Sequence, residues 1–313
     1  MMEKRITGRE AKKEDDSSEL GILEQSMRKI RLYGPTGRRI LKIYETSSKD
    51  GETRVTYNVY GGNVSLNPER YPIYAQYARS PTQMAIRSCM VDAAVKYFKS
   101  KGATHLDCLD AGFGTGAVAE SFIEVGKKLG ASVTVIGVDN SEEMFRKARQ
   151  TFSKNPAVKV FKDDILDLSE LDAESIDIIA CNATIHHLKG DKKLAALSRF
   201  RRVLKPGGLL LLGEYDVDAE PSIIYGPDGR PALEEQRREN IIRVCDGVYE
   251  EVKSGFGAET SMRMDITTDD AIDGVTEYPK SSRWWLEALK DDGFKKPEIV
   301  KTINGMVVIK AEK

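Results

Sequence analysis

The stretch "LDAGFGTGAVAE", from Leu109 to Glu120, decides the fold. An apolar run ends at Asp110, three glycines follow at Gly112, Gly114 and Gly116, and a segment of helical character begins directly after them. Glycine lets a backbone turn sharply and approach a ligand closely. The stretch therefore predicts a strand, a ligand-binding loop and a helix, in that order.

The spacing of the glycines distinguishes between the classes of ligand that such a loop could bind. A P-loop needs GxxxxGK followed by Ser or Thr, and Gly116 is followed by Ala117, so a phosphate site of this kind is excluded. The dinucleotide fingerprint GxGxxG tolerates alanine at its last position, so the loop alone leaves it open. Asp110 favours a different ligand, because its carboxylate would repel a pyrophosphate and attract a cation or a hydroxyl.

Strand and helix patterns alternate from residue 104 onwards. Runs rich in Val, Ile and Leu, such as "SVTVIGVD" and "SIDIIACN", are separated by segments of helical length. This alternation is typical of a parallel sheet covered by helices on both faces. "PEIVKTI" and "MVVIKAEK" are joined by Asn304-Gly305, which predicts an antiparallel hairpin. The predicted fold is therefore α/β, a doubly wound, mostly parallel, seven-stranded sheet with a C-terminal antiparallel hairpin strand.

Two additions accompany this core, which we expect to span residues 71–216 and 281–313. Residues 1–70 form a predicted N-terminal extension, in which a solvated tail precedes a helix over 17–33 and a hairpin made of "RRILKIYE" and "TRVTYNVYGG". Residues 217–280 interrupt the alternation with a Pro/Gly-rich stretch and a long polar helix. We expect this insertion to cap a substrate, since a mobile cover excludes water from a reaction.

Composition narrows the class of protein. The 313 residues are 40% hydrophobic and 31% charged with a net charge of −1, unlike a dedicated nucleic-acid binder. No apolar run approaches the roughly 20 residues of a membrane span. The first 20 residues lack the apolar core of a signal peptide, and the four cysteines form no CxxC pair. We therefore expect a cytoplasmic protein with reduced thiols.

Five motifs resemble, in this order, those of class I S-adenosylmethionine-dependent methyltransferases: "LDAGFGTG", "VIGVDNS", "KDDILDL", "IDIIACNATIHHL" and "FRRVLKPGGLLLLGE". The likeness covers roughly residues 104–214 with the terminal helix and hairpin, and it is strongest to the branch that acts on small molecules. It implies S-adenosylmethionine as cofactor. That molecule has no pyrophosphate and carries a sulfonium and an α-ammonium, in agreement with Asp110.

The resemblance also implies cofactor-binding residues at the carboxyl ends of the parallel strands, where open α/β sheets bind ligands. Asp110 would lie near the α-ammonium, and Asp139 would accept hydrogen bonds from both ribose hydroxyls. Asp164, in preference to Asp163, would bind the adenine amino group. The predicted set is Asp110, Gly112, Gly114, Gly116, Asp139, Asn140, Asp164, Ile165 and Asn182, with Ala183 next to it.

Three residues after the fourth and fifth strands of the pattern are catalytic candidates: His186, His187 and Glu214. Histidine titrates near neutrality and can take a proton from a nucleophile, which a methyl transfer needs only when the nucleophile must lose one. The alternative for either histidine is a packing role or a hydrogen bond to the backbone. An adjacent histidine pair lacks a third ligand, so we predict no metal site.

Four tyrosines are candidate substrate contacts. Tyr71, Tyr74 and Tyr77 recur every three residues ahead of the core, and Tyr215 ends the fifth strand of the pattern. In the enzymes that the chain resembles, a segment of this kind covers the cofactor. An aromatic face that packs on the core is the alternative for the first three, and the start of a loop is the alternative for Tyr215.

The sequence thus predicts methyl transfer to an O, N or C nucleophile of a small metabolite. One alternative is a methyltransferase directed at RNA or protein through the basic residues of the extension. Others are a nicotinamide-dependent oxidoreductase and a non-catalytic protein that binds the cofactor. The extension could complete a lid, form a homodimer contact or bind a partner.

Overall fold

The chain divides into two compact units, Met1–Gly61 and Gly62–Lys313. The computed structural model describes four strands of the first unit by their backbone. In the second unit it describes residues 75, 77–217, 241–244 and 278–313. The two units are described separately below.

The first unit contains an antiparallel sheet in the order β1-β4-β3-β2. Its strands are β1 (Met2–Arg5), β2 (Lys29–Tyr33), β3 (Arg39–Tyr44) and β4 (Arg54–Asn58). The predicted hairpin is confirmed as β3 and β4. The predicted helix over 17–33 is wrong for its last five residues, because "KIRLY" also alternates as a strand does and pairs with β3. The predicted tail is wrong for β1, which pairs with β4.

The second unit has the predicted α/β fold, with a seven-stranded sheet in the order β10-β11-β9-β8-β5-β6-β7. The strands are β5 (His105–Ala111), β6 (Ser132–Asp139), β7 (Val158–Lys162), β8 (Ile176–Asn182), β9 (Leu204–Tyr215), β10 (Lys295–Ile303) and β11 (Met306–Glu312). Strands β5 to β9 are parallel, and β11 pairs antiparallel with β9 and β10. Asn304 and Gly305 both have positive φ in the tight turn that joins β10 to β11, as predicted.

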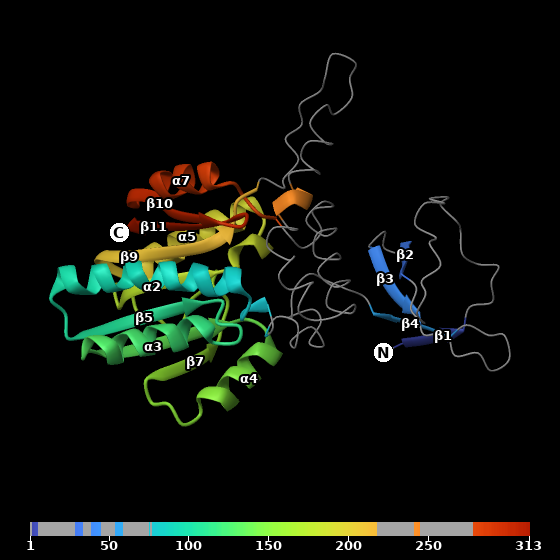
Figure 1. The fold of residues 1–313 in the computed structure, drawn as a ribbon, viewed down its shortest axis with the longest axis horizontal. Helices are drawn as coiled ribbons and strands as arrows, with labels where there is room; N and C mark the ends of the chain where they lie inside the picture. The colour runs from blue at the N-terminus through green and yellow to red at the C-terminus, as the bar shows by residue number, and fades with distance from the viewer. Residues whose placement is uncertain are drawn as a thin grey trace, which may run out of the picture. The chain divides into compact units, whose positions relative to one another are not determined.

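Helices cover both faces of this sheet. They are α2 (Pro81–Lys101), α3 (Ala117–Leu129), α4 (Glu142–Phe152), α5 (Gly190–Val203) and α7 (Ser282–Asp291), with a 3₁₀ turn, η2 (Ile185–His187). One apolar cluster joins the sheet to α2, α3 and α4, and a second joins it to α5 and α7. Figure 1 shows α2 and α3 lying side by side, each running roughly along the direction of β5. None of the helices in the described part of the chain is long and apolar enough to cross a membrane.

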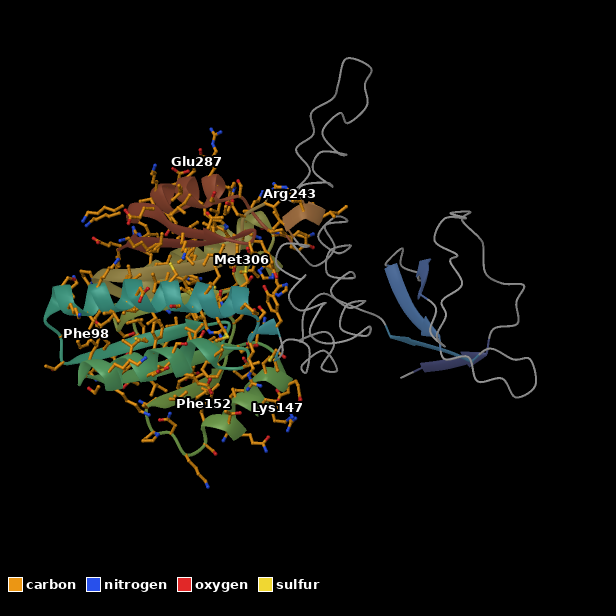
Figure 2. The ribbon with its side chains drawn as sticks, in the orientation of Figure 1. Phe98, Lys147, Phe152, Arg243, Glu287 and Met306 are labelled. Atoms are coloured by element: carbon orange, nitrogen blue, oxygen red, sulfur yellow. The ribbon has the colours of Figure 1, made fainter. Side chains whose placement is uncertain are left out.

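The sheet brings the carboxyl ends of β5, β6, β7, β8 and β9 to one edge, because these strands are parallel neighbours. The register aligns Asp110 with Gly137 and with Ala180, and it aligns Asn182 with Gly213. At the same edge β11 begins at Met306, which is labelled in Figure 2. This edge carries the candidate site.

Candidate active site

An open cavity with a volume of about 200 Å³ lies at the carboxyl edge of the sheet. Its walls come from the loops after β5, β6, β7 and β8, and from the start of α2. Eight of the nine predicted cofactor-binding residues line it. They are Asp110, Gly112, Gly114, Asp139, Asn140, Asp164, Ile165 and Asn182.

The glycine loop needs glycine at position 112 for two reasons. Gly112 has a φ of +80°, and a Cβ atom there would lie 2.2 Å from the Thr184 side chain. Gly116 also has a positive φ, but a Cβ atom there would meet the Phe152 ring at 2.4 Å. Gly116 is not among the described residues that line the cavity, although its neighbours Thr115 and Ala117 are, so its predicted contact with the cofactor stays a prediction.

Asp139 ends β6 and joins the glycine loop to the sheet. Its carboxylate accepts hydrogen bonds from the backbone N–H of Gly114 at 2.8 Å and from that of Ser141 at 2.9 Å. Burial raises the pKa of Asp139, and these two hydrogen bonds lower it in part. Each carboxylate oxygen keeps a further acceptor position for a ligand hydroxyl. The Ser141 hydroxyl, and not Asp139, caps α4 by accepting from the N–H of Met144.

Asp110 is 2% exposed and accepts a hydrogen bond from the first turn of α3, a role that the sequence analysis missed. Its Oδ2 accepts a hydrogen bond from the N–H of Ala119 at 3.2 Å. Burial raises the pKa of Asp110 well above its usual range and the charge of Asp139 adds to the rise, while the Ala119 N–H and the charge of Arg87 lower it. A cation bound beside Asp110 would favour its ionised form.

In the loop after β7, the two neighbouring aspartates have different contacts. Asp164 and Ile165 line the cavity, and Asp164 Oδ2 accepts a hydrogen bond from Asn140 Nδ2 at 3.3 Å. The Asp163 carboxylate instead accepts from the N–H of Asp164 and from the N–H of Ser169, each at 2.8 Å. The Asp163 carboxylate therefore bonds within its own loop, and Asp164 is the aspartate that faces the cavity.

His186 and Glu214 form a buried pair behind the cavity, and neither is among the described residues that line it. His186 Nδ1 lies 2.7 Å from Glu214 Oε2, and Glu214 Oε1 accepts from the N–H groups of Thr184 and Ile185, each at 2.9 Å. An ionised carboxylate can only accept, so His186 Nδ1 carries the proton. The described contacts of this pair hold η2 in place, and the catalytic role of His186 and Glu214 stays a prediction. His187, the next residue, does line the cavity.

Replacing Glu214 by leucine is expected to lower the free energy of unfolding by about 3–5 kcal/mol, because three buried donors lose their acceptor. Glu214→Gln keeps an acceptor for the two backbone N–H groups and should lose much less. Urea denaturation of both variants measures the difference.

The same pair makes stability depend on pH. Burial by itself raises the pKa of Glu214, but His186 and the two backbone N–H groups outweigh it and hold the pKa below its usual value. The stabilisation is therefore present above the unfolded-state pKa and is lost as the pH falls through the folded-state pKa. Equal stability of Glu214→Leu and the wild type at neutral pH would contradict the role of the pair.

Of the four predicted substrate tyrosines, Tyr77 lines the cavity, and Tyr71 and Tyr74 lie outside the described residues. The Tyr77 hydroxyl lies 2.9 Å from the Tyr215 hydroxyl and accepts a hydrogen bond from Gln83 Nε2 at 2.6 Å. Tyr215 is buried and is not among the described lining residues. Tyr215 therefore supports Tyr77 and does not itself reach the cavity.

Two residues of α2, Gln83 and Arg87, also line the cavity and were missed from the sequence. Gln83 is 1% exposed, and its Oε1 accepts from Asn182 Nδ2 at 2.8 Å. The sequence did contain a signal for Gln83. It is a polar residue three and seven positions before Ile86 and Met90, so it lies on the buried apolar stripe of the helix. Arg87 lies one helical turn after Gln83 and so points to the same side of α2, which means that the same pattern could have identified it.

Within the described residues no group of three or more His, Cys, Asp or Glu side chains is placed to hold a metal ion. The described carboxylates of the cavity are instead held by backbone N–H groups. This edge therefore presents carboxylate acceptors whose orientation is fixed by backbone N–H groups.

Comparisons with known proteins agree with this geometry. Residues 108–208 match the family model of methyltransferase domains. An uncharacterized 37.1 kDa protein in a transposon of Streptomyces fradiae is 31% identical over 185 residues, which cover 59% of this chain and 48% of that protein. Carboxy-S-adenosyl-L-methionine synthase of Actinobacillus succinogenes is 36% identical over 86 residues, which cover 26% of this chain and 34% of that protein. The chain thus spans about half, or less, of the length of these relatives.

Solved structures share the fold. The carbon methyltransferase of CurJ superposes with a TM-score of 0.52 at 14% identity and covers 85% of this chain and 75% of its own. The carbon methyltransferase of DszA gives a TM-score of 0.50 at 16% identity, with 80% and 58% covered. The family match and the fold agree: residues 108–208 match methyltransferase domains, and the second unit has the fold of class I S-adenosylmethionine-dependent methyltransferases.

Proposed function

We propose that this chain transfers a methyl group from S-adenosylmethionine to an O, N or C nucleophile of a small metabolite. One observation carries the proposal. Asp139, a partly buried carboxylate at the end of β6, accepts a hydrogen bond from the N–H of Gly114 in the glycine loop and faces an open cavity. Two acceptor positions on one carboxylate suit a pair of neighbouring hydroxyls.

The rest of the cavity fits the same cofactor better than it fits a dinucleotide. Asp110 already accepts the N–H of Ala119 at the start of α3, where a dinucleotide would need to place its pyrophosphate. A buried carboxylate there suits an ammonium and opposes a phosphate. Asp164 and Ile165 offer an acceptor for the adenine amino group and an apolar surface for its ring. S-adenosylmethionine, when bound, supplies a methyl group on a sulfonium that is already activated for displacement.

This chain's own residues then have to hold the acceptor in line with that methyl group and exclude water. His187 lines the cavity and is the candidate to take a proton when the acceptor is a hydroxyl or a protonated amine. Tyr77, with its hydroxyl fixed by Gln83 and Tyr215, is the candidate to orient the acceptor. Residues 217–280 supply the proposed cap.

Calorimetry with S-adenosylhomocysteine tests cofactor binding, and methyl-labelled S-adenosylmethionine tests the acceptor class. We expect S-adenosylhomocysteine to bind and NAD not to bind. Label should then appear in a small-molecule extract and not in the RNA or protein fractions of the same cells. Tight binding of NAD without binding of S-adenosylhomocysteine would overturn the proposal, and label confined to RNA or protein would overturn its substrate class.

The affinity for S-adenosylhomocysteine is expected to rise with pH. Burial raises the pKa of Asp110, and a ligand ammonium beside it favours the ionised carboxylate. Binding therefore strengthens as the pH rises through the raised pKa of Asp110, and it releases a proton below that value. Calorimetry at a series of pH values, starting at the usual pKa of an aspartate and rising from there, measures this slope. The slope should be smaller in Asp110→Asn, which keeps an acceptor for Ala119; an unchanged slope would contradict the assignment.

A further inference from the structure

A second hollow lies where the sheet ends at β7, with α4 packed beside this strand (Figure 1). It has a volume of about 370 Å³ and is formed by residues 149–160, that is, by the end of α4, the turn after it and the start of β7. We call it the edge groove. Its apolar lining consists of Phe152, which is labelled in Figure 2, Pro156, Val158 and Val160. None of its described lining residues also lines the cavity at the carboxyl edge, so the edge groove is separate from the candidate active site.

The edge groove is positively charged. Arg149 and Lys154 line it with exposed side chains, and no acidic residue is among its described lining residues. The acidic residues of α4 pair with other cations, Glu142 with Lys162 and Glu143 with Arg146. Neither Arg149 nor Lys154 forms an ion pair with a carboxylate in the described ranges. Two such cations around an apolar surface are complementary to a ligand that carries both carboxylates and apolar side chains.

The backbone of β7 is also open on the side of the groove. The strand pairs with β6, and no strand in the part of the chain that the structure describes pairs with its other side. The N–H of Val135 on β6 donates to the carbonyl oxygen of Ala157 at 2.8 Å. Because backbone groups alternate along a parallel strand, the N–H and C=O of Val160 point away from β6. An extended polypeptide can bond to both groups while its side chains enter the groove, whereas a small anion would leave them unpaired.

We propose that the edge groove binds an acidic, extended segment of a partner protein, which adds to the sheet as a strand beside β7. A second copy of this chain does not fit, because two-fold pairing of β7 would bring Arg149, Lys154 and the exposed Lys159 of both copies together. The proposal does not depend on the proposed function, since the groove and the cavity share no described residue.

Fluorescence anisotropy with labelled peptides of about eight residues, capped at both ends, tests this docking surface. The probe peptide alternates Glu and Val, so that as a strand it has one acidic and one apolar face. One control peptide has Lys in place of each Glu. A second control keeps the Glu–Val sequence but has all its peptide N–H groups methylated, so that it cannot donate to the carbonyl groups of β7. We expect the wild-type protein to bind the probe at least about 10-fold more tightly than either control.

A charge reversal in the groove locates the binding. Lys154→Glu is expected to weaken the probe about 5- to 10-fold, because one attraction becomes a repulsion at an exposed site. Lys290→Glu is the matched control, since Lys290 is an exposed lysine near the end of α7, which packs on β10 at the other end of the sheet. It should change the affinity by less than about 2-fold. Thermal unfolding checks that both variants are folded.

The possible results differ clearly. A wild-type protein that does not bind the Glu–Val probe would overturn the proposal. Equal affinity for the N-methylated peptide, or for an oligouridylate of the same net charge, would also overturn it, because the attraction would then be one of charge without strand addition. Equal losses in Lys154→Glu and Lys290→Glu would mean that the probe does not bind at the edge groove. Methyl transfer and binding of S-adenosylhomocysteine are measured separately, so failure of this proposal leaves the proposed function unaffected.

Discussion

Replacing Asp139 by alanine is expected to weaken S-adenosylhomocysteine binding by at least about 100-fold while the sheet stays folded. The wild-type carboxylate would accept from two ribose hydroxyls, and each hydrogen bond to a charged group contributes about 1.5–3 kcal/mol. Loss of both corresponds to a fall of about 10² to 10⁴ in affinity. Isothermal calorimetry measures the affinity, and circular dichroism with urea denaturation reports on the fold.

Asp163→Ala is the matched control for this experiment. Asp163 also sits after a parallel strand and also accepts hydrogen bonds from backbone N–H groups, at Asp164 and Ser169, but it is not among the residues that line the cavity. The two variants therefore share the loss of a carboxylate that orders a loop, and only Asp139→Ala loses a ligand contact. Equal affinities of Asp139→Ala and Asp163→Ala for S-adenosylhomocysteine would contradict the assignment of Asp139 to the ribose hydroxyls.

Replacing Gly112 by alanine is expected to be the most damaging single methyl addition in the site. Alanine at a positive φ costs about 1–2 kcal/mol by itself. The new Cβ would also lie 2.2 Å from the Thr184 side chain, and crowding of this kind costs about a further 1–3 kcal/mol. We expect a total loss of about 2–5 kcal/mol in the free energy of unfolding, together with severe loss of cofactor affinity, because Gly112 lines the cavity.

Gly130→Ala isolates the backbone part of this effect. Gly130 ends α3 with a φ of +64°, and a Cβ atom there would meet nothing within 4 Å. Urea denaturation should show a loss of only about 1–2 kcal/mol in Gly130→Ala, with unchanged cofactor affinity. If the two variants lose the same stability and Gly112→Ala binds as the wild type does, then the contact with Thr184 does not constrain the loop.

The order of strands, loops and helices could be predicted from the sequence because local patterns encode it. Continuous apolar runs mark buried parallel strands, and Asn304-Gly305 adopts the two positive φ angles of a tight hairpin turn whatever surrounds it. The positions of Asp110, Asp139 and Asp164 followed for the same reason. Each comes at or just after the end of a parallel strand, and parallel neighbours bring those ends to one edge.

The sequence was ambiguous in two situations. One is a short segment whose pattern fits both a helix and a strand, and the other is a side chain that could point either into the cavity or away from it. "KIRLY", over Lys29–Tyr33, carries both a helical and a strand pattern, and its pairing with β3 decides between them. His186 and His187 are adjacent and chemically identical, yet Glu214, 28 residues further on, holds one behind the cavity and leaves the other to line it.

The sequence by itself determined a glycine loop between a buried strand and a helix, with acidic residues at the ends of parallel strands. Only the tertiary structure decided which side chains face the cavity. In the tertiary structure the Asp163 carboxylate bonds within its own loop, and Gly116 packs close to the Phe152 ring. Arg87, on α2, lines the same cavity as the glycine loop. The physical reason is the distance along the sequence between the residues that interact. Strand and helix patterns depend on neighbours a few residues away, whereas the direction of a side chain at the sheet edge depends on partners that the fold brings together from distant segments.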